Sequence, residues 1–242
     1  MNKFTVVAVA VLVLCFGGLV LWSMNNRSGK MDFSKYDANT IIAADDNNGN
    51  IGDHVRGKAD SKVIIVEYAD LSCPGCASMM PYMTKLYEEY GDRVAFVFRH
   101  FPLQSHPNSR SAAAAIESAA KQDFYWEMLE ALYENRSDWL EATGQERTDV
   151  YVKIFKEIAP DGNEEQLRLD MNDSDIDKKI SFDYNLGKER SGVDATPSIF
   201  VNGEKVDIAG NNESGEQKSF EDVVKDIKKM VEKQLNDSSE NK

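Results

Sequence analysis

Two apolar runs that flank a helical pattern dominate the first half of the chain. Val63 to Val66 is a continuous run of β-branched residues, which is typical of a central strand covered on both faces. Pro74 suits the first position of a helix, where its missing N–H costs nothing, and we expect that helix to continue to about Tyr90. A second strand is predicted over residues 93–100, parallel to the first because the helix between them serves as a crossover.

The middle of the chain, from about Asn108 to Ser191, has helical spacing. Its clearest example begins at Phe124, where apolar residues recur at i, i+3, i+4 and i+7 up to Tyr133. The block is about 80 residues long, which is too long for an ordinary connection between two elements. We therefore expect a helical insertion between two halves of a sheet.

The last part of the chain predicts a hairpin and a closing helix. Residues 198–201 are a short strand, and Asn202-Gly203 is a strong two-residue turn leading into an antiparallel partner over residues 204–209. Residues 219–235 have an amphipathic helical pattern with one apolar face. That face comprises Phe220, Val223, Val224, Ile227 and Val231.

The N-terminus carries an uncharged stretch, residues 4–24, that is long enough to cross a bilayer as a helix. It ends without the small-x-small site of a cleaved secretory signal, so we expect an uncleaved anchor. A lipoprotein signal with Cys15 lipidated is a third interpretation, but Leu14 stands where a small residue is expected. The polar residues that follow predict a partly disordered tether.

These patterns divide the chain into six segments of an α/β protein. They are an anchor, a tether, the first half of the fold, the helical insertion, the second half of the fold and a polar tail, with expected bounds of 1–24, 25–50, 51–103, 104–191, 192–236 and 237–242.

The chain is acidic, with a formal net charge of −13. Residues 1–30 contain three basic residues and no acidic ones, so the rest of the chain carries a more negative net charge than the whole. Such a domain is a poor partner for nucleic acid or for anionic lipid surfaces. We therefore expect no nucleic-acid partner.

Cys73 and Cys76 are the candidate reactive residues. The Cys-x-x-Cys pair lies where the predicted strand runs into the helix, with Cys73 at the N-cap. A thiolate there is stabilised by backbone N–H groups and by the helix dipole, so Cys73 should have a lowered pKa and be the attacking sulfur. Cys76, one turn later, is then the resolving thiol.

Half of a zinc site is the other interpretation of this pair. Structural zinc needs about four ligands. Cys15 is the one further cysteine, and the three histidines (His54, His100 and His106) lack the His-x(3–5)-His spacing. We expect no metal and no other cofactor beyond a redox-active Cys73–Cys76 disulfide. A domain with one poised thiol pair suits an oxidising exterior, so we expect the N-terminus in the cytoplasm and the domain outside the membrane.

The chain resembles the thioredoxin superfamily and, within it, the DsbA-like thiol–disulfide oxidoreductases, including membrane-anchored bacterial forms. The resemblance covers roughly residues 50–235. It rests on Val66-Glu67-Tyr68, Cys73-Pro74-Gly75-Cys76, Arg99-His100-Phe101-Pro102-Leu103, the alanine-rich and Phe124-Tyr125-Trp126 helices, Ala195-Thr196-Pro197 and Asn202-Gly203. It implies a thioredoxin fold with an inserted helical subdomain.

The resemblance also implies roles for particular residues. Cys73 and Cys76 match the family's nucleophile and resolving thiol. Pro197 matches a cis-proline that faces the disulfide, with the Thr196 backbone available to a bound substrate. Glu67 matches an acidic position beneath the active site.

Two further positions carry open interpretations. Burial should raise the pKa of Glu67 so that it can accept a proton from Cys76, unless it lies at a wet strand end. His100 is expected either to tune the thiolate or to hydrogen-bond the strand end. The Pro74-Gly75 pair differs from the Pro-His of strongly oxidising members and from the Gly-Pro of thioredoxin, which leaves the redox potential open.

The sequence thus predicts a membrane-tethered extracytoplasmic thiol–disulfide oxidoreductase that introduces disulfides into exported proteins. Its expected partners are exported proteins with thiols, the membrane through residues 4–24, and a membrane redox partner that resets the pair. The alternatives are a reductase or isomerase of the same fold, and a non-catalytic module that grips peptides by the Thr196-Pro197 edge.

Overall fold

The computed structural model describes residues 31–240. The predicted anchor at residues 4–24 lies outside these residues, and so does Cys15. Within residues 31–240, none of the helices combines the length and the apolar character needed to cross a membrane.

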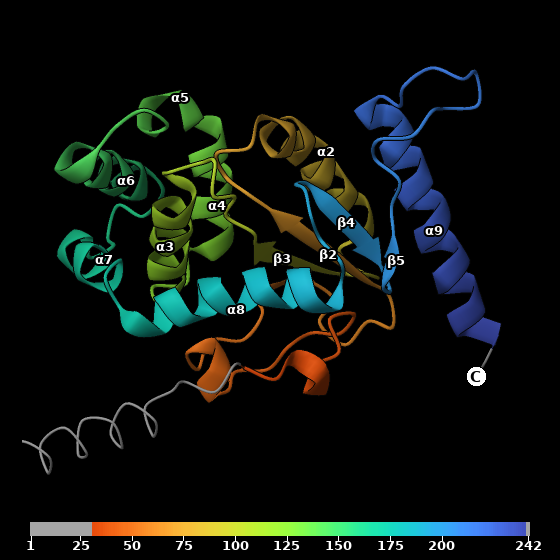
Figure 1. The fold of residues 1–242 in the computed structure, drawn as a ribbon, viewed down its shortest axis with the longest axis horizontal. Helices are drawn as coiled ribbons and strands as arrows, with labels where there is room; N and C mark the ends of the chain where they lie inside the picture. Colours follow the sequence, from red (N-terminus) through yellow and green to blue (C-terminus); the bar gives the residue numbers. More distant parts are fainter. Residues whose placement is uncertain (1–30, 241–242) are drawn as a thin grey trace, which may run out of the picture. The chain divides into compact units, whose positions relative to one another are not determined.

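A five-stranded mixed sheet forms the centre of the fold, in the order β1-β3-β2-β4-β5 (Figure 1). The central strand β2 pairs in parallel with β3 and antiparallel with β4, while β1 and β5 are antiparallel edge strands. The parallel pairing of the first two predicted strands is therefore confirmed. The bounds are β1 Val55–Gly57, β2 Ile64–Ala69, β3 Ala95–His100, β4 Ser198–Val201 and β5 Glu204–Lys205.

Both edges of the sheet differ from the prediction. Strand β1 was not expected, because Val55–Gly57 has no β-branched run and is recruited by pairing with β3. At the other edge the predicted turn is present, with positive φ at Asn202 (46°) and Gly203 (82°), as a type I′ hairpin requires. Its partner strand is shorter than the predicted 204–209, because β5 comprises two exposed residues and the chain leaves the sheet beyond Val206.

Helices surround this sheet, and six of them lie between β3 and β4 in sequence, which confirms the helical insertion. Helices α2 and α9 pack on each other and share a core with β2, β3 and β4, whereas α8 runs along β3 (Figure 1). The bounds are α2 Pro74–Tyr90, α3 Ser109–Ala120, α4 Tyr125–Glu134, α5 Arg136–Trp139, α6 Gly144–Ile158, α7 Glu164–Asp170, α8 Ser174–Arg190 and α9 Phe220–Glu240.

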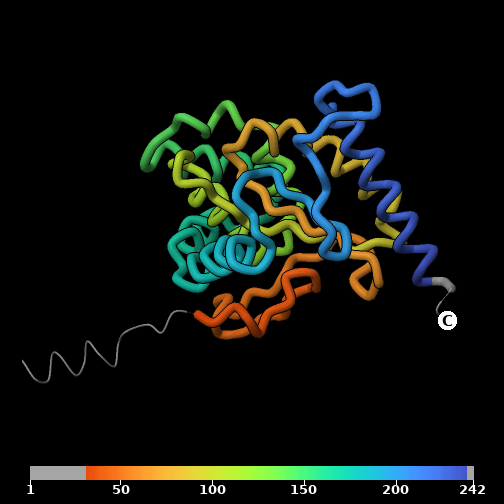
Figure 2. Tube along the Cα trace, turned by 45° about the vertical axis from the view of Figure 1, so that its right-hand side comes forward, coloured from red at the N-terminus to blue at the C-terminus, as the bar shows by residue number. Residues whose placement is uncertain are grey.

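Residues 33–50, which were expected to belong to a tether, are instead packed against the domain (Figure 2). The rings of Phe33 and Tyr36 contact Phe182 of α8, with centroid distances of 5.5 and 4.7 Å. Two short 3-10 helices, η1 Phe33–Lys35 and η2 Asp46–Asn48, order the segment. Scattered aromatic residues in a polar stretch do not reveal such docking, because their partner lies more than a hundred residues away.

Candidate functional site

The turn between β2 and α2 is held by one buried carboxylate. Asp70 accepts hydrogen bonds from the backbone N–H groups of Ser72 and Leu103, both at 2.8 Å. His106 Nδ1 lies 2.8 Å from the same carboxylate, and the Ser109 hydroxyl also donates to it. These contacts tie the turn before the thiols to the loop after β3 and to the start of α3.

Cys73 occupies the N-cap of α2 with Pro74 at its first position, as predicted. Both Cys73 and Cys76 are free thiols, and they are 7% and 1% exposed. A hydrogen bond from the Cys76 side chain lowers the pKa of Cys73 to about 5. Burial acts in the opposite direction, and the backbone N–H groups of Cys76 and Gly75 add to the lowering. Cys73 is therefore a thiolate at neutral pH.

Cys76 has the opposite environment. Burial raises the pKa of its thiol, and the nearby Cys73 and Glu67 charges raise it further. Two cysteines one helical turn apart are thus held in different protonation states. This asymmetry provides one sulfur that attacks and one that keeps its proton until exchange demands it.

The loop before β4 approaches the thiols from the other side. Cys73 Sγ lies 3.4 Å from the Thr196 carbonyl oxygen, and the Thr196–Pro197 peptide bond is cis, as the resemblance implied. A Cβ atom added to Gly75 would lie 3.4 Å from Pro197 Cδ and 3.7 Å from Cys73 Sγ. The structure therefore brings Cys73, Gly75, Thr196 and Pro197 together.

Glu67 lies in the middle of the central strand, where it pairs with Phe98 of β3 and Ile199 of β4. It is 6% exposed, which contradicts the alternative of a wet strand end, and burial raises the pKa of its carboxyl to about 7. A cavity of about 30 Å³ beside it, lined also by Met83 and Leu129, is large enough for a water molecule. Glu67 is therefore set to exchange a proton near neutral pH.

Glu67→Gln is expected to stabilise the protein in a pH-dependent way. Because folding raises the pKa of the Glu67 carboxyl, the contribution of this group to the free energy of unfolding is fully present below its ordinary pKa of 4.5. That contribution is lost as pH rises through about 7. The gain from the amide should be near zero at about pH 4 and reach about 3 kcal/mol above about pH 8. Urea unfolding of both proteins across this range measures the gap. A gap independent of pH would show that Glu67 does not titrate in this way.

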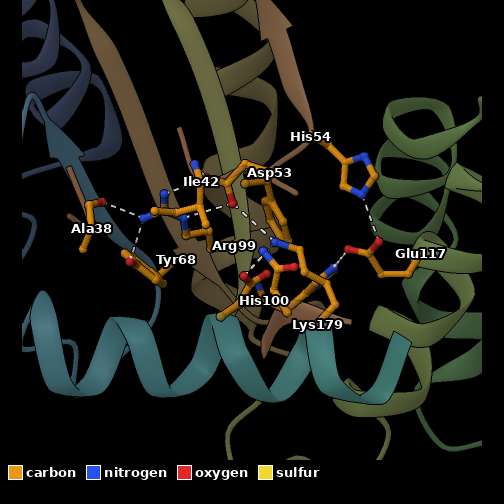
Figure 3. Close-up of polar contacts among 12 residues, drawn as sticks. Ala38, Ile42, Asp53, His54, Tyr68, Arg99, His100, Glu117 and Lys179 are labelled. Carbon is orange, nitrogen blue, oxygen red and sulfur yellow. Dashed lines mark hydrogen bonds and ion pairs between the residues drawn. The ribbon is translucent and has the colours of Figure 1, made fainter. Parts of the chain in front are cut away.

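His100 belongs to a different group of residues. Its buried ring lies with Nε2 2.9 Å from Glu117 Oε1, and its backbone N–H donates to Asp183 (Figure 3). The ring also contacts Phe98 and Tyr125. The structure places His100 in a buried charge cluster rather than against the thiols, so its predicted tuning of the thiolate stays a prediction.

The buried charge cluster joins four parts of the chain that the sequence did not connect. Arg99 forms a bidentate contact with Asp53, at 3.2 and 2.6 Å, and Lys179 lies 2.7 Å from Asp183 and 3.3 Å from Asp53 (Figure 3). Glu117 bridges His100 and His54, whose Nε2 is also 2.9 Å away. The His54 side chain is itself partly buried.

Three residues near the thiols were missed by sequence reasoning as parts of the site. Asp70 forms the buried hydrogen bonds of the turn before Cys73. Tyr133 shares a hydrophobic core cluster with both cysteines, and Arg136 Nη2 donates to the carbonyl of Ser72. Tyr133 and Arg136 lie some 60 residues after the thiols, and their apolar or charged character is ordinary for helices, so no local pattern distinguishes them.

Comparison with known proteins identifies this arrangement. Residues 49–234 match the family model described as thioredoxin. The chain belongs to the thioredoxin family. It is 33% identical over 152 residues to a probable disulfide bond formation protein D of Bacillus cereus, covering 61% of this chain and 68% of that protein.

Solved structures place this thioredoxin-family chain among DsbA-like proteins. BdbD from Bacillus subtilis, in its oxidised form, has 25% identity and a TM-score of 0.57 over 81% of this chain and 98% of its own. The alpha-DsbA1 protein of Wolbachia pipientis, with alanines at two cysteines, has 24% identity and the same TM-score over 76% and 93%. The predicted resemblance to the thioredoxin superfamily and its DsbA-like members is confirmed.

Several curated relatives are much longer than this chain. A Na(+)/H(+) antiporter NhaA 1 of Mycolicibacterium vanbaalenii is 34% identical over 154 residues, which cover 62% of this chain and 23% of the antiporter. This chain therefore spans about a quarter of the length of the first curated relatives that it matches.

Proposed function

We propose that this protein is an extracytoplasmic oxidase that introduces disulfides into exported proteins through the Cys73/Cys76 pair. The observation that carries this proposal is the position of Cys73 at the N-cap of α2, with its sulfur 3.4 Å from the Thr196 carbonyl oxygen. In this setting a hydrogen bond from the Cys76 side chain lowers the pKa of Cys73 to about 5. Nucleophilic cysteines have a pKa near 7 in thioredoxin and near 3.5 in DsbA. A stabilised thiolate favours the reduced form of the pair, which makes its disulfide an oxidant.

In the proposed reaction a substrate thiolate attacks Cys73 Sγ of the oxidised pair. The Cys73–Cys76 bond breaks, its electron pair leaves on Cys76, and a mixed disulfide joins substrate and Cys73. Glu67, with a pKa near 7, gives its proton to the departing Cys76 sulfur. A second substrate thiolate then attacks the substrate sulfur of the mixed disulfide and expels Cys73 as its stable thiolate.

This turnover leaves the protein reduced by two electrons, so the proposal includes a membrane redox partner that reoxidises the pair. Residues 4–24 would anchor the chain, with the N-terminus in the cytoplasm and the described domain outside. The relative named as a disulfide bond formation protein supports this direction of exchange.

The redox potential of the pair tests the proposal. The full chain with Cys15→Ser, in detergent, is equilibrated with glutathione mixtures and the Cys73–Cys76 state is quantified. We expect a potential well above that of thioredoxin, about −270 mV, and toward that of DsbA, about −120 mV. A value near thioredoxin's would instead indicate a reductase, and the absence of a two-electron couple would indicate a peptide-binding module.

A further inference from the structure

The small cavity beside Glu67 is lined by two kinds of residue. Some of its lining side chains are buried in the core, among them Ile65 and Phe98. Others are partly exposed at the surface of the described domain, so the cavity extends from the buried carboxyl of Glu67 toward solvent. These partly exposed residues are Arg56, Met80, Thr84, Tyr87 and Trp126.

The register of the sheet directs Arg56 and Glu67 to the same face. Arg56 of β1 pairs with Phe96 of β3, and Glu67 of β2 pairs with Phe98, two residues further along β3. Paired residues, and residues two apart in one strand, project from the same face of a sheet. Because β1 is an edge strand of the described sheet, Arg56 reaches the cavity from the rim of that face.

Three contacts hold the Arg56 side chain at this rim. Its guanidinium carbon lies 3.8 Å from the ring centroid of Tyr87 and 5.8 Å from that of Trp126. Nη1 of the guanidinium donates to the Glu130 carboxylate of α4, and the two side chains are 23% and 31% exposed. Contacts of this kind are modest at a partly exposed site, so the side chain can swing away and return.

Glu67 needs a route to solvent protons. In the proposed reaction it gives its proton to Cys76 and becomes a carboxylate, so it must regain a proton before the next turnover. A buried water needs two to four polar partners, and the lining residues Glu67, Thr84 and Arg56 offer a carboxyl, a hydroxyl and a guanidinium. The cavity is therefore suited to pass a proton by way of water.

We propose that Arg56 covers the outer end of this cavity and controls the passage of water and protons between solvent and Glu67. This inference rests on the proposed function of the thiol pair. When Arg56 moves aside, water reaches the Glu67 carboxylate and returns the proton that it gave to Cys76. When Arg56 closes again, Glu67 is dehydrated, which favours its protonated form. The ion pair with Glu130 offsets the guanidinium charge, so Arg56 is a positioning residue that acts as a cover.

The other titratable or charged groups that face Glu67 come from the two helices packed over it. Its partners in the neighbouring strands, Phe98 and Ile199, carry no charge. Arg56→Ala leaves all of the helix groups in place, so a change in the titration of Glu67 reports on the cover. They are Cys76 and Tyr87 of α2, and Tyr133 and, through Arg56, Glu130 of α4.

Arg56→Ala in the full chain, with Cys15→Ser in every variant, tests the inference. The oxidised protein is mixed with reduced glutathione from pH 5 to 9, and the rate of mixed-disulfide formation is divided by the thiolate fraction of glutathione. In wild type this corrected rate should fall as pH rises through about 7, because Glu67 loses the proton that Cys76 needs. Opening the cavity hydrates Glu67, so in Arg56→Ala the fall should occur at least about one pH unit lower. The corrected rate at pH 7 should then be about fivefold lower.

Infrared spectroscopy follows Glu67 without relying on exchange activity. The band of the protonated Glu67 carboxyl is assigned as the one that disappears in Glu67→Gln. It should titrate near pH 7 in wild type and at least about one pH unit lower in Arg56→Ala. Glu130→Gln loosens Arg56 without removing it, so it should shift the titration in the same direction by a smaller amount.

Two control variants separate the cover from other effects of an arginine. Arg56→Met keeps a long side chain over the cavity without a charge, so Glu67 should titrate as in wild type. Arg93 also lies over a tyrosine of α2, 4.8 Å from the Tyr90 centroid, and pairs with Glu232 at 3.5 Å, but it does not line the cavity. Arg93→Ala should therefore leave the titration of Glu67 and the exchange rate unchanged.

The outcomes distinguish this inference from the proposed function. A wild-type titration of Glu67 in both Arg56→Ala and Glu130→Gln would overturn the role of Arg56. A shift in Arg56→Met as large as that in Arg56→Ala would show that the charge acts and not the cover. A wild-type protein that forms no mixed disulfide, while its Glu67 band still shifts in Arg56→Ala, would overturn the function of the pair and leave the cover in place.

Discussion

Cys73→Ser is expected to abolish thiol–disulfide exchange, with a loss of more than about a thousandfold in rate. A serine hydroxyl forms no bond to sulfur, and Cys73 is the sulfur that combines a lowered pKa with a position at the end of α2, facing Thr196. Cys76 cannot replace it, because burial keeps that thiol protonated. Oxidative refolding of a reduced substrate and the reduction of insulin both measure the loss.

Cys76→Ser provides the mechanistic counterpart. This variant keeps the attacking thiolate but lacks the resolving thiol, so it should accumulate mixed disulfides with substrates that are visible on non-reducing gels. Cys15→Ser serves as the control and should retain wild-type activity. Full dithiol oxidase activity in the Cys73→Ser protein would refute the assignment of the nucleophile.

Arg99→Leu is expected to lower the free energy of unfolding by about 3–5 kcal/mol. Arg99 is fully buried, contacts both oxygens of Asp53, and donates to the carbonyl oxygens of Ala38 and Thr40 at 2.6 and 2.7 Å. Burial opposes ionisation of Asp53, but the charges of Lys179 and Arg99 outweigh it and lower the Asp53 pKa. Removing the guanidinium leaves a buried carboxylate short of a partner.

Arg110→Ala is the matched control, because Arg110 forms an ion pair with Asp177 whose side chains are 44% and 66% exposed. Exposed pairs contribute about 0–1 kcal/mol, so this variant should unfold close to the wild-type urea concentration. Equal, small losses for the two arginine variants would show that the buried cluster does not hold the fold together.

The buried charge cluster also bears on the active site through the chain that follows it. Arg99 and His100 end β3, and Leu103, three residues on, donates its N–H to Asp70 in the turn before Cys73. The cluster at the strand end and the turn at the thiols are thus linked by a short segment. Loosening the cluster should therefore disturb the setting of Cys73 as well as the stability of the domain.

Local patterns were sufficient for the elements that carry the thiols. The β-branched run at Val63–Val66, the proline after Cys73 and the Asn202-Gly203 turn each act over a few residues, through sterics, the missing N–H of proline and positive φ. The parallel pairing of β2 and β3 and the helical insertion were predicted from the lengths of the connections between the strands. These features require no knowledge of distant partners.

The surroundings of the site depend on contacts between segments far apart in the chain, which only the tertiary structure shows. The position of Glu67 was evident, but its desolvation depends on α2, α4 and both neighbouring strands closing over it. The partners of Arg99, Lys179 and Glu117 come from four separate segments, and charged residues in sequence are ordinarily solvated. The docking of residues 33–50 is likewise set by packing. The sequence by itself thus identified the two sulfurs that we predict to react, whereas the tertiary structure decided what surrounds them, because burial and charge balance exist only once distant segments meet.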